Sequence, residues 1–240
     1  MNPCFRMPTS PPGELTVLVP VDSPHVLAIG AHPDDIEIGA GGFVHRLIQE
    51  HNAVVSFLIL TEGIQHPKEG KFYEPSVRRK ESVLAAQHLG VPAANVEVLQ
   101  FPDCGLHEVG HQLIRSIESQ VYGRPHPFDI ILSHSGDDTH ADHREAHEAT
   151  ISALRNYMGT VLLYQSPSTK PNSFHPTLFV NLPEDAIRQK DRALQAHVSQ
   201  QNKEFMKIAR TVGLATSWAL FHHLTGKYCE AFEIYKWFWM

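Results

Sequence analysis

The amino-acid sequence predicts an α/β fold, a single Rossmann-like three-layer domain with its site at the carboxyl ends of a mostly parallel sheet. Short apolar runs alternate with longer segments whose apolar residues recur at helical spacing. This order is typical of a parallel sheet covered by helices on both faces. Several runs are continuously apolar, as expected of strands buried on both sides. A chain of 240 residues is long enough for one such domain with a large core.

Six short apolar runs predict the strands. They are rich in Val, Ile, Leu or Phe and are bounded by glycine, proline or polar residues, which is typical of buried strands. The first run, for example, lies between Pro24 and a glycine-containing turn. In chain order, the predicted strands cover residues 25–30, 54–60, 96–101, 128–133, 160–164 and 177–182.

The segments between these runs predict helices. The helix after the first strand follows a group of glycines and carries an apolar stripe within residues 43–48. Pro75 opens the next helix and Gly90 ends it, in keeping with the preference of proline for helix starts and of glycine for helix ends. That helix covers residues 78–89. The later predicted helices cover residues 109–121 and 142–157, followed by one that begins at Pro183 and carries the apolar residues Ile187, Leu194 and Val198.

The composition excludes several classes of protein. A formal charge of −6 leaves no basic stripe for nucleic-acid phosphates, and no apolar run has the length of a membrane span. Three widely spaced cysteines without a CxxC pair favour a reducing cytoplasm and exclude a cysteine zinc site. Residues 1–24 are rich in proline, and we interpret them as an N-terminal arm before a domain at 25–240.

Two polar segments follow predicted strands. His32-Pro-Asp-Asp35 comes after the first strand, and SHSGDDTHADH at residues 133–143 comes at the end of the fourth. Because ligands of such sheets bind beyond the carboxyl ends of the strands, the two segments are expected to converge in one crevice. Buried carboxylates and imidazoles are costly unless something pairs with them, and the pairing group can be a metal, a phosphate or a helix terminus.

Two other chemistries fit parts of the sequence less well. Gly39, Gly41 and Gly42 lack the GxGxxG spacing of a nucleotide-phosphate loop, and we interpret them as allowing a tight turn and a close approach of helix and strand. Residues 107–111 match the HExxH motif of zinc peptidases, but Gly110 weakens the helix that this motif requires. We interpret that segment as a polar helix start.

A metal site explains the two polar segments together. Catalytic zinc takes three His or carboxylate ligands and keeps one position for water, whose pKa it lowers towards neutrality. His32 and Asp35 can chelate one ion from their turn, and His143 completes the set from the start of a helix. The sequence therefore predicts a His/Asp/His metal centre, for which Zn²⁺ is the first choice and Fe²⁺ or another divalent ion also fits.

The remaining polar residues receive roles around that metal. Asp34 is placed to accept the proton of the water, and His140 to face an oxyanion or to protonate the leaving group. Asp142 is expected to hold the ring of His140. The simpler alternative is that Asp34 or Asp35 caps one helix and Asp142 caps another, but two such segments at suitable strand ends favour the metal site.

AHPDDIEIGAGG at residues 31–42 together with HADHR at 140–144 resembles the PIG-L/LmbE family of zinc-dependent N-deacetylases. The resemblance extends over most of the chain, to an arginine-bearing segment at 77–91, FPDCGL at 101–106, YQSPS at 164–168 and a stretch at 193–200. The family removes acetyl groups from N-acetylglucosamine-type sugars. The resemblance therefore implies a deacetylase whose substrate is a small N-acetyl amino sugar or a glycoconjugate.

The resemblance implies that His32, Asp35 and His143 are the metal ligands. It also implies that Asp34 is the general base and that His140, supported by Asp142, faces the tetrahedral intermediate. It adds Arg78 and Asp103 as contacts to sugar hydroxyls or a substituent, while His197 is either a substrate contact or a packed histidine. Many family members have an acidic residue directly after the HPDD motif, whereas this chain has Ile36 and then Glu37. This difference affects only the details of the turn.

Some alternatives stay open at this level. An amidase acting on a larger sugar conjugate would use the same site, and a non-catalytic metal- or sugar-binding module has no need of Asp34 beside the metal. The aromatic tail at 235–239 can pack in the core, cover the site or join the subunits of a homo-oligomer.

Overall fold

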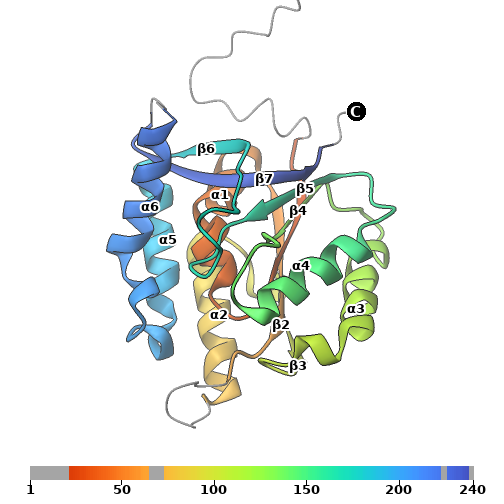
Figure 1. Cartoon of the computed structure of the whole chain (residues 1–240). Helices are drawn as coiled ribbons and strands as arrows, with labels where there is room; N and C mark the ends of the chain where they lie inside the picture. The colour runs from red at the N-terminus through yellow and green to blue at the C-terminus, as the bar shows by residue number, and fades with distance from the viewer. Residues whose placement is uncertain (1–21, 65–72, 223–225, 238–240) are drawn as a thin grey trace, which may run out of the picture.

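The computed structural model describes residues 22–64, 73–222 and 226–237. Within these ranges the chain forms a three-layer α/β domain, in which helices cover both faces of a seven-stranded sheet (Figure 1). This confirms the fold class predicted from the sequence. The proposed N-terminal arm falls almost entirely on residues 1–21, which lie outside the described ranges.

The strands follow the order β3-β2-β1-β4-β5-β7-β6 across the sheet. Neighbouring strands from β3 to β5 pair in parallel, and β7 pairs antiparallel with both β5 and β6. The sheet is therefore mostly parallel, as predicted. The strand bounds are β1 His25–Gly30, β2 Val54–Thr61, β3 Val96–Phe101, β4 Ile130–His134, β5 Thr160–Tyr164, β6 Leu178–Leu182 and β7 Tyr228–Lys236.

The helices agree with most of the predicted segments. Their bounds are α1 Asp35–His51, α2 Pro75–Leu89, α3 Gly110–Tyr122, α4 Ala141–Ala153, α5 Glu184–Ala196 and α6 Ile208–Phe221. Neither α6 nor β7 was predicted. The apolar role predicted for Val198 is wrong: α5 ends at Ala196, the chain turns at the buried His197, and Val198 lies 72% exposed in a 3₁₀ turn.

The sheet separates two apolar cores. Helices α1, α2, α5 and α6 lie on one side of it, and α3 and α4 lie on the other (Figure 1). Along β1, Val26 and Ala28 belong to the first core and Leu27 and Ile29 to the second, because successive side chains of a strand point to opposite faces. Burial on both faces explains why this strand reads as a continuous apolar run.

The glycines of α1 allow this helix to pack closely on the sheet. A Cβ atom added at Gly39 would overlap the ring of Tyr164, and one at Gly42 would overlap the side chain of Leu182. This confirms the interpretation that the glycines serve a close approach of helix and strand.

The chain reverses its direction across the sheet between β1 and β4. It moves from β1 to β2 and β3 on one side, and from β4 to β5 on the other. The carboxyl ends of β1 and β4 thus lie side by side at the switch point where open α/β sheets bind ligands.

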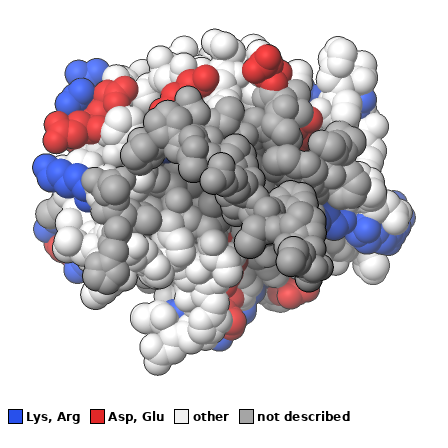
Figure 2. Space-filling model, turned by 90° about the horizontal axis from the view of Figure 1, so that it is seen from above, with Lys and Arg blue, Asp and Glu red and all other residues white. Residues whose placement is uncertain are grey.

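The surface shows both signs of charge. In the view from above, Lys and Arg lie in separate groups next to Asp and Glu around the edge of the face (Figure 2). Among the described residues, no helix has the length and apolar character needed to cross a membrane.

Candidate active site

The turn after β1 places the first group of polar side chains. The backbone N–H of His32 donates to Asp35 Oδ2 at 2.8 Å, which closes the turn. Asp34 has a left-handed backbone with φ of 106° and makes no side-chain hydrogen bond to the start of α1. Because a left-handed non-glycine residue costs about 1–2 kcal/mol, the turn holds Asp34 in a strained position, and helix capping does not explain it.

The start of α4 places the second group. His140 is the N-cap residue of α4, and its Nδ1 accepts a hydrogen bond from the backbone N–H of Asp142 at 3.2 Å. This bond leaves the Nε2 atom of His140 to carry the proton of the neutral ring. The His140 ring is therefore held by the backbone of Asp142 and not by its carboxylate.

The Asp142 carboxylate turns instead towards His32. Its Oδ2 lies 3.2 Å from His32 Nε2 and accepts from the N–H of Cys104 at 2.7 Å, while Oδ1 accepts from Leu106 N–H at 3.2 Å. These two backbone donors follow β3 and stabilise the buried charge. The predicted contact between the Asp142 carboxylate and the His140 ring is thus corrected: the partner is His32.

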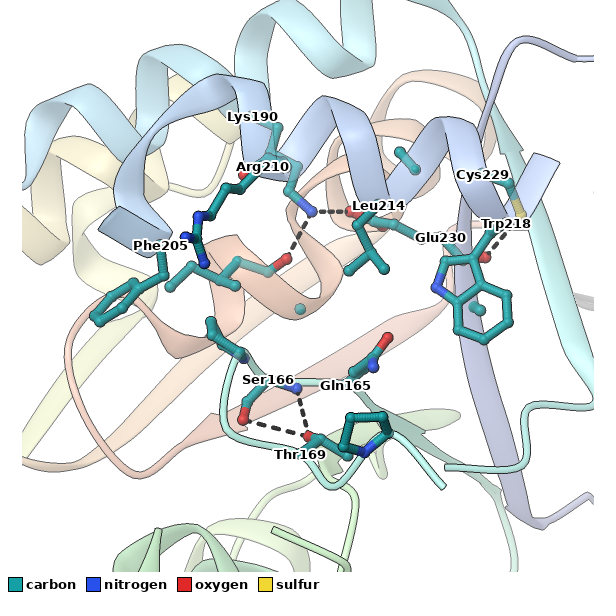
Figure 3. A pocket seen from close by; sticks show the side chains of 17 residues that line it. Gln165, Ser166, Thr169, Lys190, Phe205, Arg210, Leu214, Trp218, Cys229 and Glu230 are labelled. Atoms are coloured by element: carbon teal, nitrogen blue, oxygen red, sulfur yellow. Dashed lines mark hydrogen bonds and ion pairs between the residues drawn. The ribbon is translucent and has the colours of Figure 1, made fainter. Parts of the chain in front are cut away.

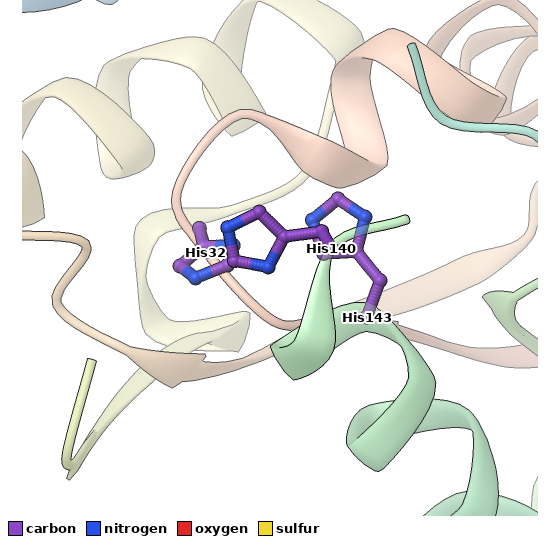
Figure 4. A group of neighbouring side chains, drawn as sticks. All are labelled: His32, His140 and His143. Atoms are coloured by element: carbon purple, nitrogen blue, oxygen red, sulfur yellow. The ribbon is translucent and has the colours of Figure 1, made fainter. Parts of the chain in front are cut away.

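The predicted metal ligands lie close together but are divided between two possible metal-binding groups: His32 and His143 belong to one with His140, and Asp35 and His143 belong to another. The two carboxylate oxygens of Asp35 lie 3.4 Å from His32 Nδ1 and 3.4 Å from His143 Nε2. The rings of His32, His140 and His143 gather between the turn after β1 and the first turn of α4 (Figure 4), with nitrogen atoms within 4.8 Å of one another. A single ion can therefore reach donors from both segments.

His134, at the end of β4, is a neighbour of this group that the sequence analysis did not single out. Its Nε2 lies 3.2 Å from Asp35 Oδ2 and accepts the backbone N–H of Ala31 at 3.1 Å. It forms a second possible metal-binding group with Asp35 and His143. Because the Ala31 N–H already engages its Nε2 lone pair, His134 is a poorer ligand than His32.

Asp103 belongs to a third possible group, with His32 and Asp142. The Asp103 carboxylate lies 3.3 Å from His32 Nε2. Because Asp142 already accepts two backbone hydrogen bonds, its oxygens are less available to an ion than those of Asp35.

The second ring nitrogen of His143, Nδ1, contacts the carboxylate of Asp138. Its Nδ1 lies 3.0 Å from Asp138 Oδ2, and the same carboxylate oxygen accepts from the hydroxyls of Ser166 and Thr169. A carboxylate behind a ligating histidine fixes its tautomer and orientation. Asp138 lies in the polar segment at 133–143, but its role could not be predicted, because that segment contains several carboxylates and its sequence does not show which one faces His143.

Burial and close charges shift the pKa values of these groups. Burial alone would raise the pKa of Asp35, but His143 and His134 hold it well below its usual range. Burial opposes a charge on His143, yet Asp35 and Asp138 raise its pKa to about 9. Burial together with His32 and His143 lowers the pKa of His140 to about 4, so the His140 ring is neutral near pH 7.

Asp34 lies next to this cluster and is only 5% exposed. Arg78 Nη2 donates to Pro33 O at 2.7 Å and lies 3.5 Å from Asp34 Oδ2. Burial raises the pKa of Asp34, and Arg78 opposes that shift. A carboxylate with a raised pKa beside a candidate metal centre is suited to accept and release a proton.

A pocket of about 610 Å³ opens onto the cluster. Its walls include Asp34, the cluster residues His32, Asp35, His140 and His143, and the predicted substrate contacts Arg78 and Asp103. Asp142 lies behind His32 and outside the lining.

His197 does not reach this pocket either. Its side chain is fully buried, and its Nε2 lies 3.2 Å from Glu37 Oε1. His197 was expected to be either a substrate contact or a packed histidine, and the structure shows a packed histidine.

The HExxH-like segment does not form a zinc-peptidase site. His107 lies in a 3₁₀ turn at Leu106–Glu108, whereas α3 begins only at Gly110. The two histidines are exposed and do not line the pocket. The interpretation of this segment as the polar start of a helix is confirmed.

Comparisons with known proteins find similar deacetylases. The family model for PIG-L, GlcNAc-PI de-N-acetylase, matches residues 27–154. The uncharacterized deacetylase YaiS of Escherichia coli is 31% identical over 177 residues, which cover 72% of this chain and 90% of that protein. The diacetylchitobiose deacetylase of Thermococcus kodakarensis is 30% identical over 196 residues, or 75% of this chain and 71% of that protein.

The fold alone does not decide the reaction. The crystal structure of GalB from Pseudomonas putida, a 4-carboxy-2-hydroxymuconate hydratase, aligns with a TM-score of 0.72 at 20% identity and covers 89% of this chain and 96% of that one. Because one fold hosts different chemistries, the function has to be argued from the site.

Proposed function

Because this chain belongs to the PIG-L family, we propose that it is a metal-dependent hydrolase that removes the N-acetyl group from an N-acetylglucosamine-type amino sugar or its conjugate. The relatives named as deacetylases support the reaction class. The observation that carries the proposal is the position of Asp34, a buried carboxylate next to a His/Asp/His cluster in one pocket. A module that only binds a sugar or a metal has no need of this second carboxylate.

The donor set fits a metal ion. Asp35 is 4% exposed between the nitrogens of two imidazoles, and His143 is oriented by Asp138 in the manner of ligating histidines. We assign His32, Asp35 and His143 as the ligands. A bound Zn²⁺, or Fe²⁺ in its place, would polarise the acetamide carbonyl and lower the pKa of a water molecule.

Asp34 acts as the general base. It accepts a proton from the attacking water, whose oxygen adds to the acetamide carbon and gives a tetrahedral intermediate. Asp34 then returns the proton to the leaving nitrogen. The C–N bond breaks, and acetate and the free amino sugar are released.

His140 stabilises the negative oxygen of the intermediate. Its ring is neutral near pH 7, and because Nδ1 accepts the N–H of Asp142, its Nε2 carries the hydrogen. A fixed N–H donor aimed at a developing oxyanion lowers the barrier without reorganisation. Arg78 and Asp103, which line the same pocket, are assigned to the hydroxyls of the sugar.

The test measures acetate release by zinc-loaded protein from a panel of N-acetyl amino sugars, free and conjugated. The Asp34→Asn variant is expected to keep its metal content while its kcat falls by about 10²–10⁴-fold. Full turnover by this variant with metal bound would show that Asp34 is not the base. No acetate from any member of the panel, with zinc bound to the wild-type protein, would overturn the proposed reaction.

A further inference from the structure

A second pocket, of about 270 Å³, adjoins the catalytic pocket. Helix α6 forms one wall, and the loop after β5 forms the opposite wall (Figure 3). Ile38, Pro167 and Phe205 belong to the walls of both pockets. The two pockets are therefore neighbours, and a group attached to a ligand in the catalytic pocket would reach the second pocket past these three residues.

The second pocket is lined mainly by apolar side chains. Leu214 and Trp218 point into it from α6, and Phe205 lies at its edge (Figure 3). Leu214 remains 45% exposed, so its apolar surface faces the open space. Apolar side chains that line a concave space are stabilised when an apolar ligand displaces water from them.

Two of the three charged residues in the lining, Lys190 and Glu230, neutralise each other, whereas the third, Arg210, is exposed. Lys190 Nζ lies 2.6 Å from Glu230 Oε1 and donates to Ile38 O at 2.7 Å. Glu230 also accepts the N–H groups of Gly42 and Phe43 at 3.0 and 2.7 Å. Lys190 and Glu230 therefore need no charged ligand, and the apolar part of the lining around Leu214 and Trp218 favours a neutral apolar group.

One polar atom remains available for a ligand. Among the described residues that line the pocket, Gln165 Oε1 is buried and accepts no hydrogen bond. Figure 3 shows the Gln165 side chain on the wall opposite α6. A buried acceptor without a donor is costly, and a single N–H or O–H of a bound molecule would satisfy it.

The walls of this pocket come mostly from a part of the chain outside the family match. The match covers residues 27–154, whereas Lys190, Leu214 and Trp218 lie on α5 and α6, and Ala231 lies on β7. The reaction centre belongs to the shared segment, and the second pocket belongs to the remainder. This division is expected when a common reaction is combined with a substrate preference specific to the protein.

We propose that the second pocket is a substrate subsite for an uncharged apolar group, an aryl ring or a short alkyl chain, attached to the amino sugar. The proposal rests on the proposed deacetylase function. The apolar group has two possible sources: a substituent on the anomeric oxygen, or an acyl chain longer than acetyl on the nitrogen. In either case Trp218 and Leu214 contact the apolar group.

The experiment compares kcat/KM across two substrate series with zinc-loaded protein. One series consists of methyl, phenyl and hexyl glycosides of N-acetylglucosamine, and the other of N-acylglucosamines from acetyl to hexanoyl. In at least one series, the larger apolar group is expected to raise kcat/KM by about tenfold or more. The series that responds identifies the source of the group, and a flat response in both overturns the proposal.

Two variants on α6 locate the effect. Leu214→Trp fills the pocket and is expected to reduce the ratio of kcat/KM between the larger and the smallest substrate by about tenfold. Leu220→Trp makes the same kind of change on the same helix, at a 68% exposed position outside the lining, and should keep the wild-type ratio. An unchanged ratio in Leu214→Trp overturns the proposal. Trp218→Ala, which removes a contact without adding volume, replaces Leu214→Trp if that variant does not fold.

A binding measurement separates this proposal from the proposed function. Calorimetry with the phenyl glycoside and with N-hexanoylglucosamine needs no turnover. If no substrate is hydrolysed but one of these ligands binds wild-type protein about tenfold more tightly than Leu214→Trp, the deacetylase function fails and the apolar site stands. Equal binding to both proteins overturns the site.

Discussion

Arg78 Nη2 lies 3.5 Å from the Asp34 carboxylate and is hydrogen-bonded to Pro33 O at 2.7 Å. Arg78 is only 2% exposed, and Glu81 lies 3.6 Å from its Nη1. The guanidinium thus holds the turn that carries Asp34 and stabilises the ionised form of the proposed base. The sequence analysis predicted Arg78 as a substrate contact, and the structure gives it this additional role.

Replacing Arg78 by methionine is expected to move the acid limb of the kcat–pH profile to higher pH. Removing the positive charge destabilises the Asp34 carboxylate, so its pKa rises and the base stays protonated up to a higher pH. The measurement is kcat against pH for wild-type and Arg78→Met protein.

The matched control is Arg79→Met. Arg79 lies on the same helix but is 41% exposed and pairs with Glu62 at 2.7 Å, so its loss should leave the acid limb in place. An Arg78→Met profile that keeps the wild-type acid limb, with only KM raised, would mean that Arg78 contacts the substrate alone.

Asp142→Asn is expected to weaken metal binding by about 10–100-fold, because Asp142 lies behind His32 and orients its ring. Competition with a chelator of known affinity measures this change. At saturating metal, most of kcat should return. A variant with wild-type metal affinity and a reduced kcat would instead support the sequence-based expectation that Asp142 acts through His140.

The sequence predicted β1, β2, β4 and β5 because most of their residues are buried, whereas the edge strand β3 is only partly buried and was predicted from its Val, Leu and Phe residues. Continuous apolar runs and the Pro and Gly residues at their ends are local signals, and they locate β1 to β5 within a few residues. Strand β6 was also predicted, from the run at 177–182, but β7 was not. Strand β7 inserts antiparallel between β5 and β6, and this pairing joins segments that are distant in the chain.

The same limit applies to the site. The HPDD and HADH segments could be identified because both follow strands that end at the same edge of the sheet. The partner of Asp142 could not be predicted, since it depends on how the backbone at Cys104 and Leu106 presents its N–H groups. The position of His134 depends in the same way on the Ala31 N–H that it accepts.

His143→Ala is expected to lose bound metal, whereas His111→Ala should retain it. His143 combines a carboxylate in front, Asp35, with one behind, Asp138, while His111 is exposed at the start of α3. Elemental analysis of the two purified variants, with circular dichroism as a check on folding, makes the comparison. If His111→Ala lost its metal and His143→Ala retained it, the HExxH segment would be the metal centre.

Gly39→Ala is expected to destabilise the protein by about 1–3 kcal/mol, because the added methyl group would overlap the Tyr164 ring. That ring cannot move aside freely, since its hydroxyl donates to Ile29 O at 2.7 Å in the core. Thermal unfolding measures the effect, with a fall in Tm of about 2–4 °C for each kcal/mol.

Gly213→Ala is the control: a methyl group there has no neighbour within 4 Å, and alanine inside α6 should leave stability unchanged or raise it by up to about 1 kcal/mol. If Gly39→Ala keeps the wild-type Tm, close packing of α1 against Tyr164 is not the reason for this glycine. A Tm that falls while kcat is preserved would separate the structural role of Gly39 from the chemistry of the HPDD turn that precedes it.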